Sequence, residues 1–220
     1  YILDASVEQI FVSLSAGSRL VLVHKDEVLN PVGFITFLRE NEITHFHTTP
    51  SLLKMYSPPS DLSSLRRVIV GGEACPKELA SAWNTYYKFY NKYGPTENTV
   101  TTTIAAYGKG KTIEKMSIGT PISNTRVYIL NATGSIVPLG VVGELCISGA
   151  GLSEGYLNQP QLTEERFVDN PFEEHKKLYK TGDLARWLPN GAIEYIGRKD
   201  DQVKIRGYRI ELGEIENVLA

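Results

Sequence analysis

The sequence lacks the features that mark secreted, membrane-spanning and nucleic-acid-binding proteins. It has only two cysteines, Cys75 and Cys146, which exclude a disulfide framework and are typical of a reducing cytoplasm. Its apolar runs fall far short of the ~20 residues that a membrane-spanning helix needs. Its 23 basic residues are balanced by 25 acidic ones, so no basic surface for nucleic acid is expected. We therefore expect a cytoplasmic protein that binds neither nucleic acids nor membranes.

The composition that remains is that of a globular protein. Hydrophobic residues make up 42% of the 220 positions, and charged residues make up 22%. A chain of this length and composition can bury a real core. It fits one large domain, or one domain and a piece of another.

The first hundred residues alternate helix patterns with short apolar runs. An amphipathic helix is expected after Ser6, which forms a capping box with Gln9, and others from Pro31, capped by Asn30, and from Pro76. Strands are expected at residues 19–24, 44–50, 66–72 and 86–94. This alternation predicts a mostly parallel sheet covered by helices.

The character of the sequence changes after about Thr101. The segments "RVYILNATGSIVP", "GELCISG" and "GAIEYIGR" are short runs bounded by turn residues, which predicts antiparallel strands or a barrel. Near the end, "VKIRGYRI" is expected to form one strand and "ELGEIENVLA" to begin a helix.

Two segments with unusual chemistry follow predicted strands. "VIVGGEA" ends in glycines, and "NKYGPTEN" places a ring, a sharp turn and a carboxylate within a few residues. Ligands of open parallel sheets bind beyond the carboxyl ends of the strands. We therefore expect both segments to line one crevice.

Four motifs together carry a family resemblance. The order and spacing of "GGEA", "YGPTE", "GELCISGAGLSEGYLNQPQLTEERF" and "YKTGDLARWLPNGAIEYIGRKDDQVKIRGYRIELGEIE" resemble those of the adenylate-forming (AMP-binding) enzyme superfamily. The match is closest to the amino-acid-activating adenylation domains of nonribosomal peptide synthetases. It covers nearly the whole chain, and the combination is specific although "GGEA" alone is not.

The resemblance implies an α/β fold that is only part of a domain. It corresponds to the second half of the large N-terminal domain, a mostly parallel sheet with helices and a distorted β-barrel, and to the first residues of the small C-terminal domain. Residues 1–103 would hold the amino-acid pocket and adenine site, and residues 104–199 the ribose site. Residues 200–220 would be the hinge and the truncated start of the small domain.

The resemblance also implies the reaction and its participants. Such domains bind ATP, Mg²⁺ and an amino acid, and they form an aminoacyl adenylate with release of pyrophosphate. They then pass the acyl group to a phosphopantetheine thiol on a carrier protein. The implied partners are the carrier and condensation domains of the same synthetase.

The implied nucleotide site contains residue types that suit each part of ATP. Tyr93 would stack on adenine, and Asp183 would accept bonds from both ribose hydroxyls, a strong type of bond because the acceptor is charged. Thr96 would contact the phosphates and Glu97 the Mg²⁺ ion, which prefers oxygen ligands. The implied nucleotide-binding residues are Gly72, Glu73, Ala74, Asn91, Tyr93, Asp183, Tyr195 and Arg198; the catalytic residues are Thr96 and Glu97, and the hinge is Asp200.

The implied substrate pocket begins with Asp4, whose carboxylate would hold the α-amino group of an amino acid. Glu8 stands where many relatives carry tryptophan, and a buried carboxylate needs a partner. Either a basic or polar substrate side chain or Lys92 would supply it, so we hypothesise a basic or polar amino acid. The implied pocket residues are Asp4, Ala5, Glu8, His47, Ile69, Gly71, Lys92, Val100 and Thr101.

The sequence departs from the family pattern in two respects. Ser153 and Glu154 stand where relatives often have Ala and Arg, which affects a local salt bridge. The chain also lacks the phosphate loop and the C-terminal lysine of the family, so we expect a fragment that is inactive by itself. Two alternatives stay open: an acyl- or aryl-CoA ligase, which Asp4 argues against, and a non-catalytic nucleotide-binding module.

Overall fold

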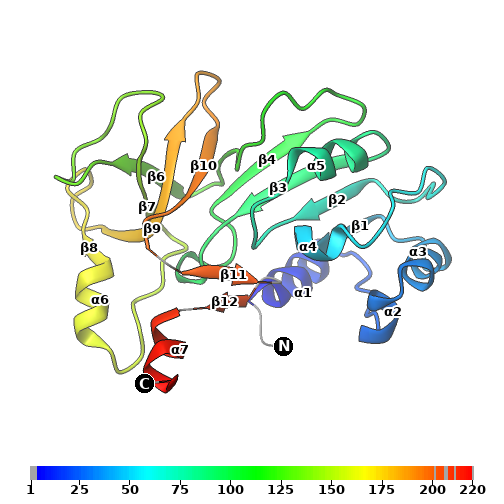
Figure 1. Ribbon diagram of the computed structural model, residues 1–220, viewed down its shortest axis with the longest axis horizontal. Helices are drawn as coiled ribbons and strands as arrows, with labels where there is room; N and C mark the ends of the chain where they lie inside the picture. The colour runs from blue at the N-terminus through cyan, green and yellow to red at the C-terminus, as the bar shows by residue number, and fades with distance from the viewer. Residues whose placement is uncertain (1–3, 201, 206–207, 211, 220) are drawn as a thin grey trace. The chain divides into compact units, whose positions relative to one another are not determined.

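The computed structural model describes residues 4–200, 202–205, 208–210 and 212–219 (Figure 1). The chain divides into two compact units. The first unit runs through Asn91 and takes in Ala106–Met116, whereas the second contains Lys92–Ala105 and Ser117–Ile205. Each unit has its own hydrophobic core.

The first unit contains the parallel strands that the sequence predicts. His45 of β1 (His45–Thr48) aligns with Arg67 of β2 (Arg67–Val70), and Arg67 aligns with the first residue of β3 (Lys88–Tyr93). The expected strands at residues 44–50, 66–72 and 86–94 are therefore confirmed. The helices of this unit are α1 (Ala5–Ser15), α2 (Lys25–Leu29), α3 (Pro31–Glu40), α4 (Pro50–Leu53) and α5 (Lys77–Asn84).

The helix starts at the two prolines are also confirmed. Pro31 opens α3 at a position where its missing N–H costs nothing, and the Asn30 side chain accepts a hydrogen bond of 3.1 Å from the N–H of Gly33. Pro76 stands immediately before α5. Helix α5 buries Trp83, whose ring meets Phe46 of β1 edge to face.

Two expectations near the N-terminus are wrong. Residues 19–24 form no strand, and Leu22 in their middle is 69% exposed, because a short apolar run does not by itself distinguish a strand from an extended connection. Ser6 does not cap the first helix, since α1 already begins at Ala5 after Asp4 and has no side-chain cap bond. The apolar face of α1 is largely open, with Phe11 66% exposed.

The second unit is built mainly from antiparallel strands, as the sequence predicts. Its larger sheet has the order β10-β9-β7-β6, with β8 paired to β9. Strand β4, which the division into units cuts after Ala105, pairs antiparallel with β5. The strands are β4 (Thr103–Tyr107), β5 (Thr120–Pro121), β6 (Thr125–Leu130), β7 (Gly143–Gly149), β8 (Phe167–Asp169), β9 (Lys177–Trp187) and β10 (Ile193–Arg198). The short helices are η1 (Thr96–Asn98) and α6 (Pro160–Arg166).

The C-terminal segment differs from the expectation in one respect. "VKIRGYRI" is not one strand but two, β11 (Val203–Ile205) and β12 (Tyr208–Ile210), which form a sheet of their own. Residues 206–207 between them lie outside the described part of the chain. The expected helix is present as α7 (Leu212–Leu219).

The sheet of the second unit has a well-packed core, which leads to a stability prediction. Leu145 on β7 is completely buried, so Leu145→Ala should lower the free energy of unfolding by about 2–5 kcal/mol through lost burial and a cavity. Leu139→Ala is the matched control, because Leu139 is 62% exposed and its truncation should change stability by about 0.5 kcal/mol or less. Urea unfolding of the two variants measures the difference, and equal losses would contradict this packing.

Candidate functional site

A buried carboxylate forms the centre of a polar cluster in the second unit. Asp183 on β9 is only 5% exposed. Its Oδ2 accepts a hydrogen bond of 2.5 Å from the hydroxyl of Tyr93. Its Oδ1 accepts one of 3.1 Å from Nη1 of Arg198 and a longer one of 3.5 Å from the hydroxyl of Tyr195. The structure therefore brings together four of the sequence-predicted nucleotide-binding residues.

A bulge in β10 makes this cluster possible. Arg198 aligns with Asp183 across the β9–β10 pair, and the register shifts between Tyr195 and Gly197. In a regular strand, residues three apart point to opposite faces. The extra residue of the bulge compensates for this, so Tyr195 and Arg198 both reach the same carboxylate.

Arg198 also binds the predicted hinge residue. Its Nε and Nη2 donate to the two carboxylate oxygens of Asp200, at 2.6 and 2.7 Å, so one guanidinium joins Asp183 to Asp200. The arginine packs over Gly182, whose φ of +75° and lack of a side chain suit the position, since a Cβ there would lie 2.8 Å from Nη2. The hydrogen bonds from Arg198 hold the pKa of Asp200 below its usual value.

The two tyrosines of the cluster remain protonated hydrogen-bond donors. Burial, followed by the negative charge of Asp183, raises the pKa of Tyr93 well above its usual value. The same two causes raise the pKa of Tyr195 to about 12. The two rings lie 6.1 Å apart between centroids. The predicted adenine-stacking ring and the predicted ribose acid are thus joined by a direct bond.

A second buried acid lies on the short helix η1 of the same unit. Glu97 is 6% exposed, and its Oε1 accepts a hydrogen bond of 2.7 Å from the hydroxyl of Tyr156. The hydroxyl of Tyr179 lies 3.3 Å from that of Tyr156. Burial, and next the charge of Glu97, raises the pKa of Tyr179 far above its usual range. Sequence reasoning gave neither tyrosine a role, although both stand inside motifs that it used.

The first unit holds several further predicted nucleotide and pocket residues on or directly after its strands. His47 aligns with Ile69, and Val70 aligns with Asn91. The N–H of Gly71, directly after β2, donates to the carbonyl of Thr48 at 3.2 Å. The predicted adenine-site residues Gly72, Glu73 and Ala74 follow, and Oε2 of Glu73 accepts from the N–H of Ser51 at 2.9 Å.

The remaining pocket residues fall into two groups. Asp4, Ala5 and Glu8 are half-buried at the start of α1, where Asp4 and Glu8 share a helical face because they are four residues apart. Lys92 is buried at the end of β3, in the second unit. Val100 and Thr101 also lie in the second unit, directly after η1, and Val100 has a positive φ of 71°. The pairing of Glu8 with Lys92 stays a prediction.

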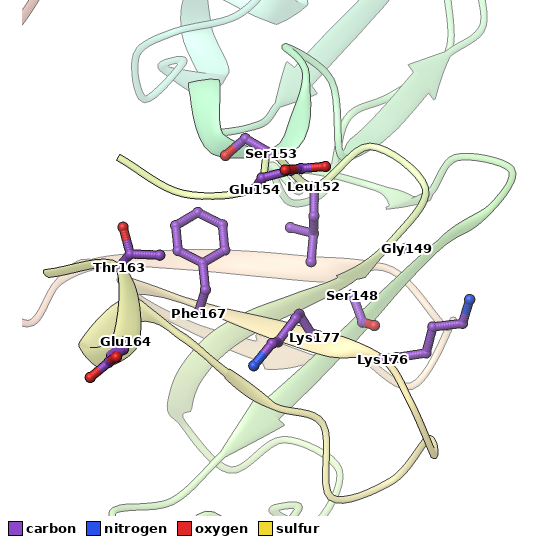
Figure 2. A pocket seen from close by; sticks show the side chains of 10 residues that line it. All are labelled: Ser148, Gly149, Leu152, Ser153, Glu154, Thr163, Glu164, Phe167, Lys176 and Lys177. Carbon is purple, nitrogen blue, oxygen red and sulfur yellow. The ribbon is translucent and has the colours of Figure 1, made fainter. Parts of the chain in front are cut away.

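A separate hollow of about 300 Å³ lies elsewhere in the second unit (Figure 2). Leu152, Ser153 and Glu154 stand on one side of it and Thr163 on another, with Phe167 near its middle. None of the predicted site residues lines this hollow. It contains the Ser153–Glu154 departure from the family pattern, and its lining includes one buried polar side chain, Ser148.

Two kinds of feature are absent from the described residues. Within the described ranges, no cluster of three or more histidine, cysteine, aspartate or glutamate side chains could hold a metal ion. In the same part of the chain, no helix is long and apolar enough to cross a membrane.

Comparison with known proteins adds sequence relatives. The model of the AMP-binding enzyme family matches residues 1–157. Bacitracin synthase 3 from Bacillus licheniformis is 50% identical over 217 residues, which cover 98% of this chain and 3% of that protein. Tyrocidine synthase 1 from Brevibacillus parabrevis is 45% identical over 217 residues, which cover 98% of this chain and 20% of that protein. The chain therefore spans only a small part of each synthase.

Solved structures agree with these relatives. The Vibrio cholerae adenylation domain AlmE, solved in complex with glycyl-adenosine-5'-phosphate, is 32% identical and superposes with a TM-score of 0.87. That match covers 99% of this chain and 42% of the solved one. An NRPS protein containing adenylation and PCP domains is 30% identical with a TM-score of 0.79, covering 86% of this chain and 34% of that one.

The fold and these matches define an adenylate-forming enzyme. The chain belongs to the AMP-binding enzyme family. Its similarity to the peptide synthases and to the solved adenylation domains confirms the resemblance found in the motifs, and the chain corresponds to part of such a domain.

The two hydrogen bonds from Arg198 to Asp200 lead to a prediction about the pKa of Asp200. Arg198→Lys replaces a planar two-pronged donor with a single ammonium, so the pKa of the Asp200 carboxyl should rise toward its ordinary value. Carboxyl-carbon NMR titration of the chain measures this pKa. Arg186→Lys is the matched control, because Arg186 pairs with Glu194 at 2.6 Å and should leave Asp200 unchanged. An Asp200 pKa that stays low in Arg198→Lys would show that another group causes the shift.

Proposed function

We propose that the chain is the nucleotide-binding and substrate-binding part of an adenylation domain that activates an amino acid for nonribosomal peptide synthesis. The observation that carries this proposal is the Asp183 cluster, a buried carboxylate held by Tyr93, Tyr195 and Arg198. It occurs in a chain of the AMP-binding enzyme family whose relatives are peptide antibiotic synthases.

The proposed reaction has two steps. First, a carboxylate oxygen of the amino acid attacks the α-phosphorus of ATP, the bond from that phosphorus to the bridging oxygen breaks, and pyrophosphate leaves with both electrons. Second, a phosphopantetheine thiol attacks the acyl carbon, loses its proton, and displaces AMP. The protein needs no covalent nucleophile for the first step, because positioning and charge stabilisation accelerate such transfers.

The nucleotide would be held mainly by the Asp183 cluster. Asp183 would accept hydrogen bonds from the ribose hydroxyls, and Arg198 next to it would offset negative charge at the α-phosphate. Tyr93 would present its ring to adenine while its hydroxyl stays on Asp183. Asn91, aligned with the end of β2, would read the adenine amino group beside Gly72, Glu73 and Ala74.

Magnesium would enter with the nucleotide. The described residues include no group of three or more histidine, cysteine, aspartate or glutamate side chains that could hold a metal ion. Mg²⁺ typically binds through one or two protein carboxylates together with substrate phosphates. The buried acid Glu97, with Thr96 beside it, fits that arrangement. Bound there, Mg²⁺ would neutralise charge on the phosphate oxygens. Glu97 would hold the ion, and Thr96 would donate a hydrogen bond to a phosphate oxygen.

The amino acid would bind beside α1 and the ends of the first-unit strands. Asp4 at the start of α1 would pair with the α-amino group, which favours an amino acid over the acyl or aryl acids of CoA ligases. Glu8 lies one turn further along the same face, so it would meet the substrate side chain. We therefore propose a basic or polar amino acid as the substrate.

The proposed partners follow from the reaction. A similar solved protein contains adenylation and PCP domains in one chain, which supports a carrier domain as the acceptor of the acyl group. A condensation domain of the same synthetase would use the loaded carrier. We place this reaction in the cytoplasm, where the two free cysteines of the chain stay reduced.

The ribose role of Asp183 is tested by Asp183→Asn in a complete adenylation domain that contains this chain. Losing a charged acceptor should raise the KM for ATP in pyrophosphate exchange by about 10- to 100-fold. Asp169→Asn is the matched control, because Asp169 is an exposed acid that pairs with the exposed Lys177 at 2.7 Å. An unchanged KM for ATP in Asp183→Asn would overturn the assignment.

The substrate class is tested by pyrophosphate exchange with a panel of amino acids in the same complete domain. We expect the highest kcat/KM for a basic or polar amino acid, and we expect Glu8→Gln to lower that preference by removing the charge. A strong preference for a bulky aliphatic amino acid would contradict the proposal.

The two alternatives give different outcomes. Exchange driven by fatty or aryl acids would identify a CoA ligase. Calorimetry of the chain itself with ATP and with an aminoacyl adenylate analogue addresses the non-catalytic module: tight binding of the analogue without turnover by the complete domain would favour that module.

A further inference from the structure

Helix η1, which carries Glu97, needs support from outside itself. It has only three residues and is followed by Thr99, whose φ of 50° is left-handed. Such a short element cannot fix a side chain through its own hydrogen bonds. The support comes from residues 150–159, which connect β7 to α6 and are called the β7–α6 loop below. Figure 2 shows part of this loop, with Leu152 to Glu154 labelled.

The β7–α6 loop holds η1 at the acid itself and at the residue that follows the helix. The N–H of Ser153 donates to the carbonyl of Glu97 at 2.8 Å. The hydroxyl of Thr99 donates to the carbonyl of Gly151 at 2.6 Å. Two bonds of opposite direction therefore fix η1 against one loop.

The same loop fixes the position of Tyr156. The N–H of Tyr156 donates to Oγ1 of Thr163 on α6 at 2.9 Å, and its ring packs edge to face on Phe167 with centroids 5.6 Å apart. Gly155 has a φ of +139°, and a Cβ there would lie 2.3 Å from Thr163. Only glycine allows the loop to approach α6 so closely.

The hydroxyl of Tyr156 contacts the carboxylate of Glu97. It donates to Oε1 of Glu97 at 2.7 Å, and the hydroxyl of Tyr179, which is fully buried on β9, lies 3.3 Å from it. Hydrogen bonds to a charged carboxylate are about twice as strong as neutral ones and constrain its rotation.

We propose that Tyr156 is a positioning residue, whose hydroxyl orients the Glu97 carboxylate toward the magnesium and phosphate end of the nucleotide. This inference rests on the proposed function, because it presumes the role given there to Glu97. Tyr156 acts through Glu97 and does not itself touch the nucleotide.

The test compares ATP binding with and without Mg²⁺ by calorimetry in a complete adenylation domain that contains this chain. Tyr156→Phe keeps the ring on Phe167 and removes only the hydroxyl. We expect the gain in ATP affinity on adding Mg²⁺ to fall by about tenfold, while the affinity without Mg²⁺ stays the same. A merely structural role would leave this ratio unchanged.

A matched control is available in the same unit. Tyr128 donates its hydroxyl to Oε1 of Glu173 at 2.5 Å, so Tyr128→Phe removes the same group from the same kind of acceptor. It should leave the Mg²⁺-dependent gain unchanged. If Tyr156→Phe does not fold, Thr163→Val replaces it, since this change removes the acceptor of the Tyr156 N–H and should lower the gain in the same direction.

The variant Glu97→Gln distinguishes a failure of the role proposed for Glu97 from a failure of the role proposed for Tyr156. If this variant keeps the full Mg²⁺-dependent gain, the proposed role of Glu97 is overturned and the role of Tyr156 falls with it. If Glu97→Gln loses the gain while Tyr156→Phe, or Thr163→Val in its place, keeps it, then only the positioning role of Tyr156 is overturned.

Discussion

The burial of the Asp183 charge is the constraint on which the second unit depends. An ionised carboxylate that leaves water costs several kcal/mol unless it is paired and hydrogen-bonded. Here Tyr93 at the end of β3 and Tyr195 and Arg198 on β10 supply those bonds. Each donor must keep its place for these hydrogen bonds to form, so the strand pairing and the polar cluster support one another. A ribose would bring two further hydroxyls to the same acid.

Glu97 is held in a similar way to Asp183, but by a different part of the chain. It too is a buried acid that accepts from a tyrosine hydroxyl, but its partner Tyr156 comes from a loop rather than a strand. Tyrosine suits both positions, because a rigid ring can be fixed by packing while its hydroxyl remains a neutral donor. At Asp183 the two tyrosines stand beside the cation Arg198, whereas the donor that the β7–α6 loop brings to Glu97 is neutral. At both acids the tyrosine hydroxyls help to fix the orientation of the carboxylate.

The sequence predicted the parts of this structure that depend on local signals. Pro31 with Asn30, and Pro76, marked two helix starts, and the motif order identified the family and with it Asp183 and Arg198. The strand expected at residues 19–24 failed because an apolar run alone does not provide a pairing partner. The bond from Tyr156 to Glu97 could not be predicted, because it joins residues 59 positions apart and depends on how Gly155 lets the loop meet α6. Contacts of that range follow from the assembled fold and not from spacing.

The bulge in β10 has a consequence for how this segment can change in evolution. Ile196, within it, is half-exposed, so its side chain can be exchanged with little effect on packing. A deletion between Tyr195 and Arg198 would leave the two donors two positions apart in a regular strand, still on one face. An insertion that kept the single bulge would instead turn one of the donors away from Asp183. Homologues can therefore lack the extra residue without separating the two donors, whereas one added residue in an alignment at this point would indicate that Tyr195 and Arg198 no longer share a carboxylate.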